Sequence, residues 1–284
     1  MYKYGRGVEE NYIQAVQWFK KPAERGYAEA QANLGLMYEY GKGVKQDYTE
    51  AILWYEKAAE QNDVKSQLSL ALFYKFGKGV LKDYTQVFYW YKKAAELGDT
   101  GAQLNLGFMF QYGKGVEQDY EEAVTWYKKS AERGHPEAQA SLAWIYENGK
   151  GIEADLKEAI YWYKKSAEQG NTKAQLKLGI IYKNGNGTAE DYTQSFYWYK
   201  KVAQQGDAHA QLNVGIMYEF GKGTTQDYTN AVHWYKSAAV QGLSEAQTRL
   251  GWMHENGKGV EQDYSKAISL YKNAAKNGGT NAQL

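Results

Sequence analysis

Apolar and polar residues recur along the chain with a period of 36 residues, and each period contains two amphipathic segments. In the unit 28–63, the first segment covers residues 28–40 and the second covers residues 47–61. Both segments place their recurrent residues at the i, i+3, i+4 and i+7 spacing of one helix face. The recurrent residues of this unit are Gln31, Leu34, Gly35 and Tyr38 in the first segment and Tyr48, Ala51, Trp54, Tyr55 and Ala59 in the second. No segment alternates with a period of two over a useful length, so the pattern predicts helices only.

The residues that begin and end the second segments are typical of helix caps. Position 47, numbered as in the unit 28–63, is Asp or Asn in all eight repeats, and such a side chain accepts hydrogen bonds from the first helical turn. Glu or Gln follows three residues later in six repeats, which predicts a capping box. The cap residues are Asn11, Asp47, Asp83, Asp119, Asp155, Asp191, Asp227 and Asp263, and the capping-box partners are Gln14, Glu50, Gln86, Glu122, Glu158 and Gln194. The second segments end at Gly, or at Asn62 in one repeat, as expected for a left-handed residue after a helix.

A Gly-x-Gly pair separates the two segments of every repeat. A dinucleotide-binding loop needs a third glycine and lies between a strand and a helix, whereas these pairs follow a helix. We therefore interpret the pairs as turns that end the first helices. Position 59 is always Ala and position 35 is always Gly or Ala, so neighbouring helices are expected to approach closely at these positions.

One helix pair cannot bury both of its apolar stripes, whereas a row of stacked pairs can. The repeats therefore predict an all-α fold in which antiparallel helix pairs form an α-solenoid. We expect a single solenoid over residues 1–284. Its predicted parts are a partial repeat at 1–27, full repeats at 28–63, 64–99, 100–135, 136–171, 172–207, 208–243 and 244–279, and a stub at 280–284.

The repeat unit A-x-A-Q-x-x-L-G-x-x-Y-x-x-G-x-G-V-x-x-D-Y-x-x-A-x-x-W-Y-x-K-A-A-E-x-G resembles the Sel-one-like repeat (SLR) family, a relative of the tetratricopeptide repeat. The resemblance covers the whole chain, and seven second helices carry the family's Trp while Leu270 replaces it in the eighth. The resemblance implies a right-handed solenoid whose first helices line a concave groove, and a scaffold that binds other proteins. It also implies a bacterial protein, because bacterial members are often secreted or periplasmic and some neutralise toxic effectors.

Composition excludes several other classes of protein. The 34 Lys and Arg residues nearly balance the 33 Asp and Glu residues, so the net charge of +1 does not indicate a nucleic-acid partner. The absence of Cys excludes disulfides, thiolate zinc sites and a Cys nucleophile. The four His residues fall at different repeat positions and no carboxylate pair stands out, so no enzyme activity, metal site or cofactor is predicted. No apolar run approaches the roughly 18 residues of a membrane span, and we expect no membrane insertion.

The most informative feature is a second apolar face on the first helices. Positions 33, 36 and 40 point away from the recurrent face, where a simple surface helix would be polar. Position 36 is nevertheless always apolar, position 40 is aromatic or Asn, and position 33 is polar. We predict that these residues form a groove that binds a partner: Asn33, Leu36, Tyr40, Leu72, Phe76, Asn105, Phe108, Tyr112, Trp144, Asn148, Lys177, Ile180, Asn184, Asn213, Ile216, Phe220, Arg249, Trp252 and Asn256. The alternative is that this face packs inside the solenoid.

The groove predicts a non-enzymatic scaffold that binds a protein or peptide. Its expected anchors are Phe108, Tyr112, Trp144 and Trp252, and its expected specificity residues are Asn105, Asn148, Asn213, Asn256 and Arg249. One alternative, from the family resemblance alone, is a bacterial immunity or inhibitor protein that neutralises a toxin or lipase effector. A second alternative is a binder of glycans or peptidoglycan fragments, with or without hydrolase activity, because aromatic platforms and Asn side chains hold sugars.

The two ends of the sequence do not resemble the polar capping repeats that solenoids normally carry. We therefore expect a fragment of a longer chain whose uncapped ends stack on neighbouring molecules. An upstream signal peptide is compatible with a fragment. The expected location is accordingly open: a soluble protein of the bacterial cytoplasm, of the periplasm or of the exterior.

Overall fold

The computed structural model describes residues 11–278, and within this range the chain folds into helices without strands. The predicted all-α repeat fold is confirmed, while the first ten residues and the predicted stub at 280–284 lie outside the described range. The first helices of the repeats are α2 (Ala28–Tyr40), α4 (Val64–Phe76), α6 (Thr100–Tyr112), α8 (Pro136–Asn148), α10 (Thr172–Asn184), α12 (Ala208–Phe220) and α14 (Ser244–Asn256). The second helices are α1 (Tyr12–Glu24), α3 (Tyr48–Ala59), α5 (Tyr84–Glu96), α7 (Tyr120–Glu132), α9 (Leu156–Glu168), α11 (Tyr192–Gln204), α13 (Tyr228–Val240) and α15 (Tyr264–Lys276).

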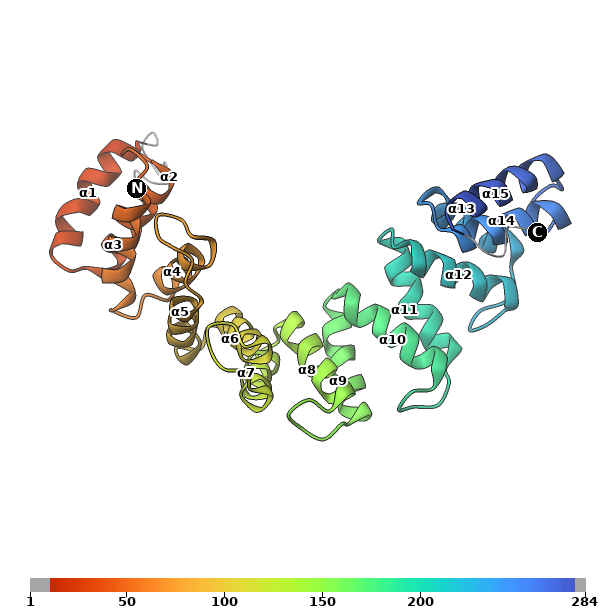
Figure 1. Ribbon diagram of the computed structural model, residues 1–284, viewed down its shortest axis with the longest axis horizontal. Helices are drawn as coiled ribbons and strands as arrows, with labels where there is room; N and C mark the ends of the chain where they lie inside the picture. The colour runs from red at the N-terminus through yellow and green to blue at the C-terminus, as the bar shows by residue number, and fades with distance from the viewer. Residues whose placement is uncertain (1–10, 279–284) are drawn as a thin grey trace. The chain divides into compact units, whose positions relative to one another are not determined.

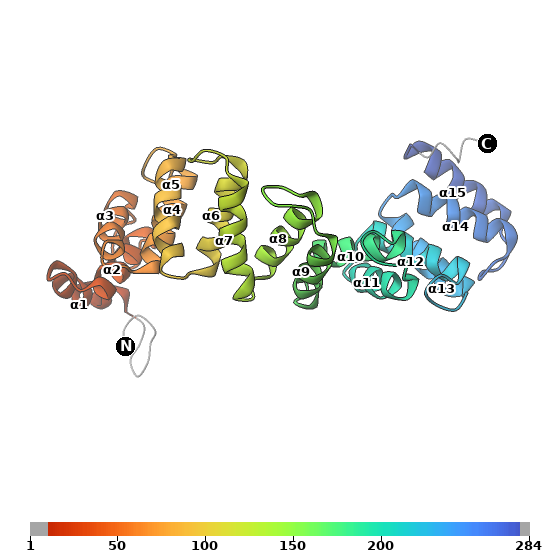
Figure 2. The ribbon, with the colours of Figure 1, turned by 90° about the horizontal axis from the view of Figure 1, so that it is seen from below.

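The chain divides into two compact units, Met1–Glu153 and Ala154–Leu284, at the loop between α8 and α9. The first unit contains α1 to α8 and the second contains α9 to α15 (Figure 1). Within each unit every helix packs against its neighbours in the chain, so helix pairs follow one another in a row (Figure 2). That both units belong to one solenoid over residues 1–284 stays a prediction. Across residues 11–278, no helix has both the length and the apolar character needed to cross a membrane.

The second helices begin as predicted, but four of the six predicted capping boxes do not form. The side chain at position 47 caps each second helix; the Asp47 carboxylate, for example, accepts hydrogen bonds from the N–H groups of Thr49 and Glu50 at 2.9 and 3.1 Å. The N–H of Asp47, which a capping box would pair with the Glu50 side chain, donates instead to the carbonyl oxygen of Tyr38 at 3.0 Å. In four of the six repeats with a predicted capping box, the N–H of the N-cap residue donates to a carbonyl oxygen near the end of the preceding helix and is not available to a capping-box side chain. The predicted capping-box pairing is therefore wrong for Glu50, Gln86, Glu122 and Gln194. The physical reason is that the turn brings the end of the first helix over the start of the second. For Gln14 and Glu158 the pairing stays a prediction.

The Gly-x-Gly pairs are turns that end helices, as predicted. Gly41 follows α2 in the left-handed region with φ 63°, and Gly43 has φ 72°. A Cβ atom on Gly43 would lie 2.3 Å from the carbonyl oxygen of Tyr12 in the preceding second helix. Both glycines are thus required by the backbone, the first for its conformation and the second for close packing between repeats.

A buried Gln at position 31 joins each first helix to the second helix before it. The Gln31 Nε2 donates to the carbonyl oxygen of Ala23 at 3.1 Å, and the Gln211 Nε2 donates to that of Ala203 at 3.2 Å. These carbonyls belong to the last turn of a helix, and each also accepts the N–H of the glycine three residues later, Gly26 or Gly206, at 3.0 Å. Leaving such a buried amide unpaired costs about 1–3 kcal/mol, so the bond helps to fix how consecutive helices meet.

The small residue at position 35 accommodates the tyrosine at position 55. Tyr235 is fully buried, and a Cβ atom on Gly215 would lie 2.5 Å from its ring. The same approach recurs between Gly107 and Tyr127, at 2.6 Å. The predicted close approach of the two helices is therefore confirmed. Contact with the small residue at position 35 buries the ring of the tyrosine at position 55.

Candidate partner-binding surface on the first helices

The second apolar face of the first helices is open to solvent within each unit. At position 40, Tyr40 is 61% exposed and Phe76 and Phe220 are each 56% exposed. The exposed residues of the predicted groove are Tyr40, Leu72, Phe76, Phe108, Tyr112, Asn148, Ile180, Asn184, Phe220, Trp252 and Asn256. The half-buried ones are Asn33, Leu36, Asn105, Trp144, Lys177, Asn213, Ile216 and Arg249. None of these side chains is fully buried, so the face retains apolar area that a partner can cover.

Asparagines on this face are held by their own helices. The Nδ2 of Asn105 donates to the carbonyl oxygen of Gly101 at 2.8 Å, and the Nδ2 of Asn213 donates to that of His209 at 2.9 Å. The Nδ2 of Asn148 donates in the same way to the carbonyl oxygen of Trp144, at 2.7 Å. Each bond uses one of the two amide hydrogens and fixes the direction of the side chain.

Arg249, a predicted specificity residue, is part of an ion-pair network inside the second unit. Its Nη1 lies 3.2 Å from the Oε2 of Glu219, and its Nη2 lies 3.2 Å from the Oε1 of Glu245. The Tyr235 hydroxyl donates to the same Glu219 oxygen, and burial together with this hydrogen bond and the nearby charge raises the pKa of Tyr235. Arg249 therefore balances a carboxylate that is only 8% exposed, a role that the sequence analysis missed.

The three positions of this network meet again at other places, which we call junctions. A junction joins position 39 of one repeat, the tyrosine at position 55 of that repeat and position 33 of the next. At one junction the Tyr55 hydroxyl donates to the Oε2 of Glu39 at 2.7 Å, and at another the Tyr127 hydroxyl donates to the Oε1 of Gln111 at 2.6 Å. We call the junctions of Glu39, Gln111 and Glu219 closed, because the residue at position 39 accepts the tyrosine's hydrogen bond.

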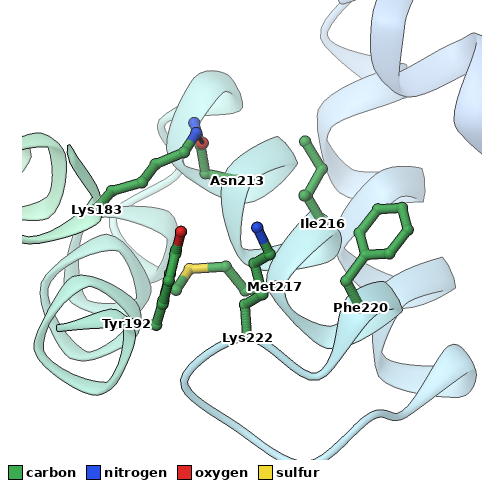
Figure 3. A pocket seen from close by; sticks show the side chains of 7 residues that line it. All are labelled: Lys183, Tyr192, Asn213, Ile216, Met217, Phe220 and Lys222. Atoms are coloured by element: carbon green, nitrogen blue, oxygen red, sulfur yellow. Dashed lines mark hydrogen bonds between the residues drawn. The ribbon is translucent and has the colours of Figure 1, made fainter. Parts of the chain in front are cut away.

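Two junctions carry Lys75 and Lys183 at position 39, and we call them open. Within residues 11–278, the hydroxyls of Tyr91 and Tyr199 at these junctions have no hydrogen-bond acceptor. Burial alone raises the pKa of both tyrosines, that of Tyr199 to about 12. A cavity of about 210 Å³ lies at the first open junction and one of about 240 Å³ at the second (Figure 3). The change from an acceptor to a lysine therefore coincides with a cavity.

Positions 33, 36, 37, 39, 42 and 48 line both cavities, whereas Val87 and Tyr91 line only the first and Phe220 lines only the second. The first is lined by Lys75, Tyr84, Val87, Tyr91, Asn105, Phe108, Met109 and Lys114, and the second by Lys183, Tyr192, Asn213, Ile216, Met217, Phe220 and Lys222. Of the predicted residues, Asn105 and Phe108 meet in the first cavity, and Asn213, Ile216 and Phe220 meet in the second. The other predicted residues line neither.

The lysines at positions 39 and 42 and the tyrosine at position 48 line both cavities but were not among the predicted site residues. The change of residue type at position 39 was the available indication. Over residues 11–278, the structure places no three His, Cys, Asp or Glu side chains where they would hold a metal ion.

Comparison with known proteins agrees with the repeat geometry. The sequence profile of the Sel1 repeat matches the chain at residues 1–27, 28–63, 64–99, 100–135, 136–171, 172–207, 208–243 and 244–279. Among solved structures, a protective antigen with an SLR fold from uropathogenic Escherichia coli is 40% identical, with a TM-score of 0.86 over 94% of this chain and 57% of its own. A Sel1 repeat protein from Oxalobacter formigenes is 37% identical, with a TM-score of 0.74 over 95% of this chain and 78% of its own.

The chain spans 57% of the length of the E. coli relative. No protein with a curated description matches the sequence. Because the eight profile matches together cover residues 1–279, the chain belongs to the Sel1 repeat family, whose members are helical scaffolds that generally bind other proteins.

Proposed function

We propose that this chain is a non-enzymatic scaffold that binds a partner protein or peptide on the apolar faces of its first helices. The observation that carries the proposal is the exposure of large apolar side chains on a face that recurs from repeat to repeat. Phe220 is 56% exposed, whereas Met217, one turn earlier on the same helix, is 4% exposed and belongs to the core. Complete burial of a Phe side chain contributes about 1.5–3 kcal/mol, so covering the exposed half of Phe220 contributes roughly 1–1.5 kcal/mol of hydrophobic free energy.

Variation among the repeats supports a role in recognition. Positions that build the framework, such as the Gln at position 31, hardly change from one full repeat to the next. Position 36 changes from Leu36 to Phe108, Trp144 and Ile180 along the chain. A surface of this kind presents a different apolar shape in each repeat, which suits a partner that lacks internal repetition.

The proposal is tested with peptides selected on the purified chain from a random display library and titrated by fluorescence anisotropy. The double substitution Tyr112→Ala, Trp144→Ala removes two predicted anchors from α6 and α8. We expect it to weaken binding of the selected peptides by about 2 kcal/mol, roughly thirtyfold in Kd, because central aromatic anchors dominate such interfaces.

The matched control is the double substitution Trp18→Ala, Tyr89→Ala. It also removes one Trp and one Tyr from the first unit, but these side chains are exposed on the second helices α1 and α5. Unchanged affinity in the Tyr112→Ala, Trp144→Ala variant, with unchanged circular dichroism, would show that the first-helix face does not bind the peptides.

A further inference from the structure

We propose that the two open junctions bind acidic side chains of the partner, so that the preferred ligand is a peptide segment in which carboxylates alternate with apolar residues. The inference rests on the proposed function and names the chemistry of its ligand. Its basis is the contrast between junctions: closed junctions have a built-in acceptor for the buried tyrosine, and open junctions have a cavity beside two lysines.

Positive charge gathers at the second cavity without a counter-charge. Lys183 reaches it from α10 and Lys222 from the loop after α12 (Figure 3). The Nζ of Lys183 donates to the Oδ1 of Asn213 at 3.2 Å, and the Nζ of Lys222 lies 4.9 Å from the ring centroid of Tyr192. No carboxylate of residues 11–278 lies within ion-pair distance of either ammonium group. A carboxylate placed here would receive charge-assisted hydrogen bonds, which are about twice as strong as neutral ones.

The first cavity repeats this arrangement in the other unit. Lys75 and Lys114 line it, and the Nζ of Lys114 lies 5.8 Å from the ring centroid of Tyr84. Neither lysine has a carboxylate of the described chain within ion-pair distance. A pair of lysines at positions 39 and 42 thus lines a cavity twice, at residues that are 108 apart in the sequence.

The unpaired hydroxyl of a buried tyrosine, at the edge of the first cavity, provides the second, independent indication of a ligand. Tyr91 lines the first cavity and is only 5% exposed, and its hydroxyl lacks an acceptor among residues 11–278. At a closed junction the equivalent hydroxyl of Tyr55 donates to the carboxylate of Glu39. A ligand carboxylate at the open junction would therefore supply the acceptor that the chain itself supplies elsewhere.

Size and lining indicate an acidic side chain on a peptide rather than a bare anion. The second cavity, of about 240 Å³, is larger than a single ion needs, and Ile216, Met217 and Phe220 form its apolar part. The hydrocarbon stem of Glu and a neighbouring aromatic ring fit such a lining. Two ammonium groups and one amide match the two oxygens of a carboxylate.

The test compares two fluorescein-labelled decapeptides with the full chain by fluorescence anisotropy. One alternates glutamate with phenylalanine, and the other has glutamine in place of every glutamate. We expect the glutamate peptide to bind at least about tenfold more tightly at roughly 0.05 M salt, with the ratio shrinking at roughly 0.5 M salt as ions screen the pairing.

Substitution of the junction lysines then locates the preference. The double substitution Lys75→Glu, Lys183→Glu gives both open junctions the glutamate that Glu39 and Glu219 provide at position 39 of closed junctions. We expect the tenfold preference for the glutamate peptide to disappear. Lys75→Gln with Lys183→Gln removes the charge without adding repulsion and is expected to lose most of the preference. The control, Lys92→Glu with Lys236→Glu, makes the same charge change at exposed positions of α5 and α13 and is expected to keep it.

Equal affinity for both peptides, or an equal loss of preference in the control, overturns the inference. If both peptides bind equally and Tyr112→Ala, Trp144→Ala weakens both, the inference fails while the proposed function stands. If neither peptide binds, the inference is also overturned, and the library-selected peptides test the proposed function separately.

Discussion

Two junctions of the second unit differ in polar chemistry but share one framework. At the closed junction, Tyr235 is fully buried and donates to Glu219, which also pairs with Arg249. At the open junction, Tyr199 is 4% exposed and has Lys183 rather than Glu219 at the equivalent place. Both rings pack against a glycine at position 35, so packing alone holds the tyrosine in place. The comparison shows that the fold needs the ring and that the residue around the hydroxyl is free to vary.

This freedom has an energetic consequence. A hydrogen bond from a tyrosine hydroxyl to an acceptor in the protein contributes about 0.5–1.5 kcal/mol net, because an unpaired hydroxyl that reaches solvent bonds to water instead. The hydroxyls of Tyr91 and Tyr199 are not among the buried unpaired atoms of residues 11–278, so the open junctions forgo this contribution without burying an unpaired group. Lysine at position 39 supplies no acceptor to the tyrosine, which agrees with a role in binding.

The largest expected loss of stability comes from removing the acceptor of the closed junction, Glu219. Glu219→Ala leaves Arg249 and Tyr235 without their shared acceptor. We expect the free energy of unfolding to fall by about 3 kcal/mol, because the buried Tyr235 hydroxyl loses its partner and Arg249 keeps only the exposed carboxylate of Glu245 as a counter-charge. Urea unfolding followed by circular dichroism measures this. The control is Glu245→Ala, which removes an exposed carboxylate from the same arginine and is expected to cost less than about 1 kcal/mol. Equal losses in the two variants would contradict the assignment of Glu219 as the centre of the network.

Alkaline pH is expected to lower the free energy of unfolding, because the buried tyrosines ionise less readily in the folded state than in the unfolded state. An unfolded tyrosine ionises near pH 10, whereas the pKa of folded Tyr199 is raised to about 12. Between these values the folded state binds the extra proton, so its contribution is present below pH 10 and is lost as the pH rises through 12. The loss from this one group is about 3 kcal/mol, because each unit of difference between the two pKa values corresponds to about 1.4 kcal/mol. Urea midpoints measured across this range should fall less steeply in Tyr199→Phe, and an unchanged slope in that variant would contradict the prediction.

The smallest expected effects come from removing the hydroxyl of Tyr235 or of Tyr199 at neutral pH. Tyr235→Phe removes a hydrogen bond to a carboxylate and is expected to cost about 1–2 kcal/mol. Tyr199→Phe removes a hydroxyl that has no acceptor and is expected to change the free energy of unfolding by less than about 0.5 kcal/mol. Chemical unfolding of both variants checks the difference. A larger cost for Tyr199→Phe would mean that its hydroxyl is paired and that the junction is not open.

The sequence was sufficient for the framework because its determinants are local and periodic. The cap at Asp47, the turn at Gly41 and the small residue at Gly215 each follow from a rule that spans a few residues. The capping box failed since the Tyr38 carbonyl, brought back by the turn, takes the N–H of Asp47.

The candidate site was only partly predictable for a related reason. Phe108 and Phe220 were found from the unexpected apolar face, and both line a cavity. The lysines were missed because a junction joins residues that are 16 and 30 apart, as in Tyr235, Glu219 and Arg249. Nothing in the spacing along one helix shows that these residues meet, and only packing between repeats brings them together.

The most direct test of binding at the open junctions uses methionine methyl groups as local reporters. Met109 and Met217 line the two cavities, and Met253 occupies the equivalent position at the closed junction of Glu219. In a chain labelled with ¹³C at the methionine methyls, titration with the glutamate–phenylalanine decapeptide is predicted to shift the resonances of Met109 and Met217 to saturation and to leave Met253 unchanged. Shifts of equal size at Met253, or no shifts at Met109 and Met217, would contradict the account.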